Sequence, residues 1–154
     1  MTLQMNREER EEFLSGLHVG IISIEDPGRG PLAAPIWYDY EPGGELWVIT
    51  AEASRKGKLL AAGSRFSLCV QTETPPYKYV SVEGPITSIG TSDYAKDERS
   101  MAHRYLGPDF GEQYLEATGG EAARQEAAQL RIAMRPERWL TTDYSKQFSS
   151  EGSG

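Results

Sequence analysis

The sequence holds one cysteine, two histidines and no long apolar run. Cys69 has no second cysteine with which to form an internal disulfide, so the cytosol is the default compartment. His18 and His103 are too few for a histidine-based metal cluster. No apolar run approaches the roughly 20 residues that a transmembrane helix needs. We therefore predict a cytoplasmic protein without a metal site or a membrane span.

Basic residues are outnumbered as well. The 154 residues include 16 Lys and Arg against 23 Asp and Glu, a formal net charge of -7. This balance argues against nucleic acid as a partner, because tracking a phosphate backbone needs a broad basic surface. A chain of this length buries roughly 68–70% of its unfolded surface, enough for one core. We expect a single domain over residues 1–144 and a flexible Ser/Gly-rich tail over 145–154.

Three of the 16 basic residues stand close together at one point. Arg55, Lys56 and Lys58 stand where the strand-like run 46–51 gives way to the helix-like run 59–62. The first turn of a helix exposes unpaired N–H groups and the positive end of its dipole. Three cations there repel the dipole and one another, so the pattern indicates a bound anion.

A phosphate is the anion that this arrangement suits best. Its oxygens would accept hydrogen bonds from the helix N–H groups, from the hydroxyls of Thr50 and Ser54, and from a guanidinium. The alternative is a set of solvated surface cations near a helix start, which is common for basic triplets. The convergence of a strand end, a short turn and a helix start on one point favours the phosphate.

Alternation and turn residues predict a mainly β protein with flanking helices. Expected strands cover 19–24, 32–40, 45–51, 67–72, 77–89 and 129–134. Expected helices cover 6–16 and 92–106, with weaker helical patterns over 110–117 and 121–128. Six short strands with few crossover helices indicate a closed or split antiparallel barrel. Gly107 and Pro108 are expected to stop the longer helix.

A resemblance follows from the order of the motifs along the chain. Pro35-Ile-Trp37, Leu46-Trp-Val-Ile-Thr50, Ser54-Arg-Lys56 and Tyr79-Val-Ser-Val-Glu-Gly84 together resemble the pyridoxamine 5'-phosphate oxidase-like superfamily of flavin and deazaflavin proteins. The resemblance covers about residues 10–141. It implies a six-stranded split β-barrel of the FMN-binding type, and a homodimer that binds its cofactor in a groove between subunits.

The resemblance also implies which residues hold the cofactor. The family's phosphate-binding positions fall on Thr50, Ser54, Arg55 and Lys56, in agreement with the charge pattern. The strand that usually lies against the cofactor ring supplies the candidate ring contacts Ala33, Pro35, Ile36 and Trp37. Trp37 and Tyr38 face opposite sides of their strand, so at most one of them meets the same pocket.

The chain departs from true pyridoxamine phosphate oxidases near its C-terminus. It has Arg138-Trp-Leu-Thr-Thr142 where those enzymes carry an Arg-Leu-His segment that grips the vitamin, so pyridoxal phosphate synthesis is not expected. The segment 75–84 is more similar to the actinobacterial branch often assigned to the deazaflavin F420. Lys58, and less strongly Lys78, offers an extra cation for the phosphodiester and polyglutamate tail of F420.

The substrate side is less well marked. Tyr77 and Tyr79 are candidates to stack beside a small planar substrate, and Tyr77 is a weak candidate for a proton donor. Core or surface packing is the alternative for each. No side chain has the partners of a nucleophile, and hydride transfer by a bound cofactor needs none.

Three functions remain open. The first is an F420-dependent oxidoreductase that transfers a hydride to or from a small unsaturated or quinone-like molecule. The second is an FMN-dependent oxidase or reductase that uses the same pocket. The third is non-catalytic, either a cofactor carrier or a flavin- or haem-binding module. A shared fold does not separate them.

Overall fold

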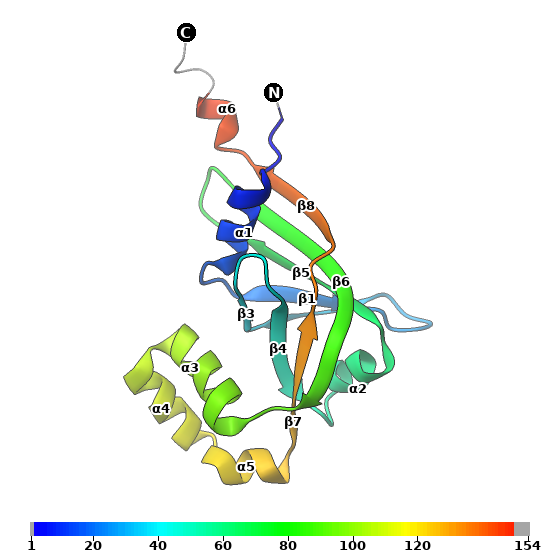
Figure 1. Cartoon of the computed structure of the whole chain (residues 1–154), viewed down its shortest axis with the longest axis vertical. Helices are drawn as coiled ribbons and strands as arrows, with labels where there is room; N and C mark the ends of the chain where they lie inside the picture. Colours follow the sequence, from blue (N-terminus) through cyan, green and yellow to red (C-terminus); the bar gives the residue numbers. More distant parts are fainter. Residues whose placement is uncertain (1, 150–154) are drawn as a thin grey trace.

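The computed structural model describes residues 2–149, which form a curled antiparallel sheet flanked by helices (Figure 1). The strands are β1 Gly20–Ile24, β2 Leu32–Ile36, β3 Tyr38–Tyr40, β4 Leu46–Ala51, β5 Arg65–Gln71, β6 Lys78–Thr91, β7 Gln129–Met134 and β8 Arg138–Asp143. The helices are α1 Arg7–Ser15, α2 Arg55–Ala62, α3 Arg99–Leu106, α4 Pro108–Ala117, α5 Gly120–Glu126 and α6 Lys146–Ser149, with a π-helical turn at Tyr94–Glu98.

The long strand β6 belongs to two sheets. Its first half pairs with β5 and β8 in sheet A, which has the order β2-β1-β5-β6-β8. Its second half pairs with β7 in sheet B, which has the order β6-β7-β4-β3. A register shift between Ile86 and Ser88 marks the change of partner. The two sheets therefore curl around one core as a half-barrel, in agreement with the predicted split-barrel architecture.

The predicted number of six strands is wrong, because residues 2–149 already form eight. The expected strand 32–40 divides at Trp37, where the chain leaves the partner β1 for the partner β4. β8 was not predicted at all. Its inward positions include the polar residues Thr141 and Asp143 while Leu140 points outward, so the usual hydrophobic alternation is inverted.

The helix predictions hold with changes at the ends. Asn6 caps α1 through a capping box and Gly16 ends it. Asp93 caps the π-helical turn that leads into α3. Gly107, with φ +81°, separates α3 from α4, and Pro108 starts α4 rather than only ending α3. No helix within residues 2–149 combines the length and apolarity of a membrane span.

The predicted tail over 145–154 is described only in part. Lys146–Ser149 forms the short helix α6. The Lys146 ammonium lies 2.8 Å from a carboxylate oxygen of Glu9 in α1, so this helix contacts the opposite terminal helix. Residues 150–154 lie outside the described range.

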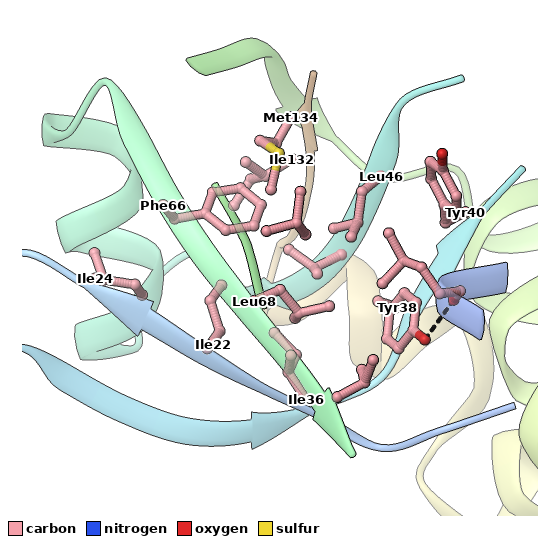
Figure 2. Packing of buried hydrophobic residues seen from close by; sticks show 14 of the residues in the cluster. Ile22, Ile24, Ile36, Tyr38, Tyr40, Leu46, Phe66, Leu68, Ile132 and Met134 are labelled. Carbon is pink, nitrogen blue, oxygen red and sulfur yellow. Dashed lines mark hydrogen bonds between the residues drawn. The ribbon is translucent and has the colours of Figure 1, made fainter. Parts of the chain in front are cut away.

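The core gathers apolar side chains from both sheets (Figure 2). Ile22 and Leu68 from sheet A point toward Leu46 and Ile132 from sheet B, and all four have no exposed surface. Tyr38 is equally buried, and its hydroxyl donates a 2.6 Å hydrogen bond to the Leu14 carbonyl of α1. Burial raises the pKa of Tyr38, so the phenol remains a donor.

Replacing Tyr38 by Phe is expected to lower the free energy of unfolding by about 1 kcal/mol, because the Leu14 carbonyl loses its side-chain donor. Urea denaturation followed by circular dichroism measures the change. Tyr144→Phe is the matched control, since the Tyr144 side chain is 40% exposed. Equal effects of the two substitutions would contradict a stabilising hydrogen bond between Tyr38 of β3 and Leu14 of α1.

Candidate cofactor site

A side-chain cap joins the start of α2 to the end of β4. Ser54 is the N-cap, and its hydroxyl oxygen accepts from Gly57 N at 3.0 Å. The same hydroxyl donates to the Ala51 carbonyl at 2.6 Å. Thr50, which is 6% exposed, places its hydroxyl 3.3 Å from that of Ser54. Both predicted hydroxyls therefore lie at the helix start, but Ser54 is already engaged in capping its own helix.

A glycine permits this close arrangement. A Cβ at position 57 would fall far inside van der Waals contact of the Ala51 carbonyl and 3.0 Å from the Glu52 carbonyl. Gly57 therefore lets the first turn of α2 lie directly on the turn that ends β4. That turn fixes where the N–H groups of the helix point.

Arg55 has an internal acidic partner. Its Nη2 and Nε lie 2.5 and 3.2 Å from the two carboxylate oxygens of Asp26, in a bidentate pair. Asp26 is only 7% exposed and follows β1, whereas the Arg55 side chain is 53% exposed. Hydrogen bonding to Asp26, and next its charge, raise the pKa of Arg55. Asp26 therefore holds the guanidinium in place and offsets one of the three cations.

Two backbone donors and one ammonium remain available at this point. Within the described residues, the N–H groups of Arg55 and Lys56 have no hydrogen-bond partner, as expected for the first two helical positions. Lys56 forms no ion pair there, and no acid occupies the first turn of α2. These groups fit the oxygens of a phosphate, with the outer edge of the Arg55 guanidinium beside them.

Lys58 is placed differently. It lines a shallow groove with the ends of α2 and α5, in which Glu52 and Glu126 are the other charged residues. Two acids against one cation give this groove a net negative charge. Lys58 therefore lies beside the capped turn but has acidic neighbours, so an anionic cofactor tail gains less from it than the sequence suggested.

The predicted ring segment runs along the edge of sheet A. Asp26 follows the last residue of β1, Ile24, and Ile24 lies opposite Leu32, the first residue of β2. β2 therefore begins near the ion pair of Asp26 and Arg55 and runs away from it. Ala33 and Pro35 are exposed on the outer face of β2. Ile36 is 8% exposed and belongs to the core cluster, so its side chain is turned away from that face.

Trp37 lies where β2 passes into β3 and turns toward α3 and α4. Its ring stacks on Tyr105, with centroids 4.8 Å apart and planes 6° from parallel. Tyr38 faces the core, as the alternation predicted. Trp37 therefore lies at the end of β2 that is opposite to the Asp26–Arg55 pair.

The two candidate substrate tyrosines are separated from α2. Tyr79 lies on the outer face of sheet A, with Gln71 and Thr142 as neighbours in register. Tyr77 is 49% exposed beside Pro75 and Phe148, at the β5–β6 turn. β5 runs from the end of α2 to that turn, so Tyr77 and the capped turn lie at opposite ends of the strand. One chain alone does not bring them together.

The histidines take no part in this site. His18 stacks on Phe13, and its Nε2 lies 3.0 Å from the Phe13 carbonyl oxygen. His103 lies 3.2 Å from Glu112 across α3 and α4. Among the described residues there is no group of three or more His, Cys, Asp or Glu side chains that suits a metal ion.

Asp26 is the residue that sequence reasoning missed. It stands in the turn-rich segment Glu25–Pro31, where Asp is an ordinary turn residue, and it is 29 positions away from Arg55. Only the pairing of β1 with its neighbours brings it to the start of α2. No local pattern in the sequence marks such a contact.

Comparison with known proteins finds one matching family and several solved structures with a shared fold. Residues 7–143 match the family described as Pyridoxamine 5'-phosphate oxidase. The curated proteins contain no match to the chain. The solved structure of the conserved hypothetical protein Rv2991 from Mycobacterium tuberculosis has a TM-score of 0.70 and 21% identity, over 95% of this chain and 89% of that one.

Two further solved structures have names that mention a cofactor. An F420 reductase has a TM-score of 0.60 and 19% identity, over 84% of this chain and 94% of that chain. The FAD and heme binding protein from Mycobacterium smegmatis has a TM-score of 0.63 and 18% identity, over 92% of this chain and 73% of that chain. At these identities the likeness extends to the fold alone.

Proposed function

The chain belongs to the pyridoxamine 5'-phosphate oxidase family, and from that premise we propose that it is an F420-dependent oxidoreductase acting on a small unsaturated or quinone-like molecule. The observation that carries this proposal is the capped start of α2, where the N–H groups of Arg55 and Lys56 have no hydrogen-bond partner among the described residues and Lys56 forms no ion pair there. A deazaflavin supplies the hydride chemistry when it is bound. The protein binds its phosphate and orients its ring.

Each residue of the site has a separate task in this proposal. Asp26 fixes the Arg55 guanidinium, and the N–H groups of Arg55 and Lys56 receive phosphate oxygens. The Thr50 hydroxyl lies within hydrogen-bond distance of the Ser54 hydroxyl and helps to orient it. The small residues Ala33 and Pro35 leave a flat surface on β2.

The choice of F420 rather than FMN rests on the similarity of segment 75–84 to the branch often assigned to F420, and an F420 reductase is among the proteins that share the fold. An FMN-dependent enzyme is the alternative, because both cofactors present a phosphate to the same turn. A non-catalytic flavin- or haem-binding module is the third candidate, and the shared fold with a FAD and heme binding protein supports it. His18 stacks on Phe13 and contacts its carbonyl oxygen, which disfavours haem ligation by His18.

Fluorescence titration of the cofactor-free protein with F420 and with FMN at matched salt tests the proposal. We expect tighter binding of F420, followed by oxidation of reduced F420 when menadione is added. Tighter binding of FMN would move the protein to the flavin branch. Binding without any hydride transfer to a panel of quinones and enones would support the non-catalytic module.

We also propose that the protein works as a homodimer, because the cofactor surface is open in a single chain. The outer face of sheet A is built from small and apolar side chains. One row of neighbours in register crosses all five strands, through Pro35, Ile21, Cys69, Ser81 and Leu140. Charged residues lie beside this row at Arg65, Glu83 and Arg138. An apolar centre with a charged rim suits a two-fold interface.

Leu140→Ala is expected to weaken dimerisation at least about tenfold, because the Leu140 side chain is 63% exposed in one chain and each dimer loses two copies of it. Sedimentation equilibrium measures the dimer constant. The control is Ile89→Ala, since Ile89 is 43% exposed but pairs within sheet B. If only Ile89→Ala changes the dissociation constant of the dimer, the interface does not lie on the outer face of sheet A.

A further inference from the structure

The helices α3, α4 and α5 line an open pocket that is separate from the capped turn of α2. Figure 1 shows the three helices grouped beside β4 and β7. α3 packs closely on α4, while contacts between these helices and the two strands are few. The space between them is a pocket of about 390 Å³. It opens on the side of β4 to which Ile49 points, whereas Thr50 points into the barrel.

The floor of this pocket is apolar and its wall is aromatic. Met101, Ala102 and Leu115 form the floor and are 2–4% exposed. The rings of Trp37 and Tyr114 stand at its side, with centroids 5.6 Å apart and planes 53° from parallel. An open pocket of this size with an apolar floor and an aromatic wall suits a small-molecule ligand.

One carboxylate gives the pocket a polar end. Glu98 is 8% exposed, and its two oxygens accept from Ser92 Oγ at 3.0 Å and from Arg124 Nε at 3.2 Å. A carboxylate has about four lone-pair positions, so Glu98 keeps acceptor capacity. Burial raises the pKa of Glu98, against the opposing effects of Ser92 and Arg124.

The neighbouring cation is already committed. The Arg124 guanidinium donates to the carbonyls of Leu115, Thr118 and Gly120 and to the Thr118 hydroxyl, as well as to Glu98. It therefore joins α4 to α5, and its charge is balanced by Glu98. An anionic ligand would meet the Glu98 carboxylate without a free cation to compensate it.

We propose that this pocket is a second ligand site, which binds an uncharged aromatic compound of one or two fused rings with an O–H or N–H group that donates to Glu98. The cavity is at the small end of the range of about 300–1,000 Å³ for ligand pockets, which limits the size of the compound. Trp37 and Tyr114 contact its rings, and Met101 and Leu115 cover its apolar edge. Binding requires no cofactor, so this proposal stands apart from the function of the α2 site.

Titration of the cofactor-free, isotope-labelled protein with 2-naphthol and with 2-naphthoate tests the site. The two probes share their rings and differ in charge at pH 7. We expect 2-naphthol to bind at least about tenfold tighter, because Glu98 repels the carboxylate. In amide and indole NMR spectra, the shifts should fall on Trp37, on Met101 and Ala102, and on Leu115.

Two variants separate the pocket from general surface binding. Tyr114→Ala should weaken 2-naphthol binding about five- to tenfold through loss of an aromatic wall. Phe110→Ala is the control, since Phe110 is a 58% exposed aromatic residue of the same helix that does not line the pocket. Ala127→Trp, at the exposed rim, should fill the opening and abolish binding.

Shifts confined to the pocket and lost in the Tyr114 and Ala127 variants would support the site. Absence of 2-naphthol binding, equal affinity for 2-naphthoate, equal effects of Tyr114→Ala and Phe110→Ala, or shifts on the outer face of sheet A would overturn it. A failure here leaves the titrations with F420 and FMN unaffected, because they report on the α2 site.

Discussion

Reversing the charge of Arg55 and Lys56 together, with Glu at both positions, is expected to weaken binding of F420 or FMN at least about hundredfold. A hydrogen bond to a charged group contributes about 1.5–3 kcal/mol, and every 1.4 kcal/mol is a factor of ten in affinity. The double substitution removes two such contacts and adds repulsion between carboxylates and phosphate. Fluorescence titration of the cofactor measures the loss.

The control separates a local effect from a change in total charge. Lys96→Glu with Arg135→Glu changes the net charge by the same amount, at two exposed positions outside α2. Affinity should change little in this control, particularly at physiological ionic strength. A hundredfold loss in both double variants would show that the overall field, and not the capped turn, holds the cofactor.

The single substitution Lys56→Glu separates the loss of cofactor binding from the loss of stability that follows when Arg55 is replaced. Arg55→Glu leaves the carboxylate of Asp26 without its bidentate donor, so the double variant also loses stability. Lys56→Glu alone keeps the paired Asp26 and Arg55 intact. It should still weaken cofactor binding about tenfold or more. Unchanged affinity in a folded Lys56→Glu protein would remove Lys56 from the phosphate site.

The capped turn illustrates what the sequence predicts well. The positions of Thr50, Ser54 and the cations follow from local rules for strand ends, N-caps and helix dipoles, which act over a few residues. The structure places Thr50, Ser54, Arg55 and Lys56 at the start of α2, and their binding of a phosphate stays a prediction. The role of Asp26 does not follow from such rules, because the contact depends on the pairing of strands far apart in the sequence.

Tertiary pairing also explains the errors in the strand count. The run from Leu32 to Tyr40 keeps one alternation throughout, so nothing local marks the change of partner at Trp37. β8 carries polar residues on its inner face, where the Thr141 hydroxyl oxygen accepts a hydrogen bond from Met5 N at 3.0 Å. Such a strand can be recognised only when the strands that pair with it are known.

The pocket between the helices and sheet B could not be predicted from the sequence either, because it too depends on tertiary structure. Met101 and Leu115 lie at ordinary apolar positions of amphipathic helices, which normally indicate core packing. Whether such helices close fully on a sheet depends on the geometry of the connections, such as the Gly107 turn and the Arg124 contacts. The sequence therefore predicts the helices but not the space that they leave.

Gly57→Ala is expected to lower the free energy of unfolding by at least about 2 kcal/mol and to weaken cofactor binding about tenfold. Helix propensity alone predicts the opposite sign, since Ala is about 1 kcal/mol better than Gly inside a helix. The steric term is larger, because the new Cβ would overlap the Ala51 carbonyl and press on that of Glu52. Relief requires the start of α2 to move away from β4.

That movement connects stability with binding. The hydrogen bonds from Gly57 N to Ser54 and from Ser54 to Ala51 hold the N–H groups of the first turn in place, so a displaced turn aims them away from the phosphate. Gly30→Ala is the control, since a Cβ at Gly30 in the β1–β2 loop would meet no atom within 4 Å. Urea denaturation and cofactor titration of both variants measure the two effects. If Gly57→Ala stabilises the protein and leaves affinity unchanged, helix propensity outweighs the contact, and the close packing of α2 on β4 is not what shapes the site.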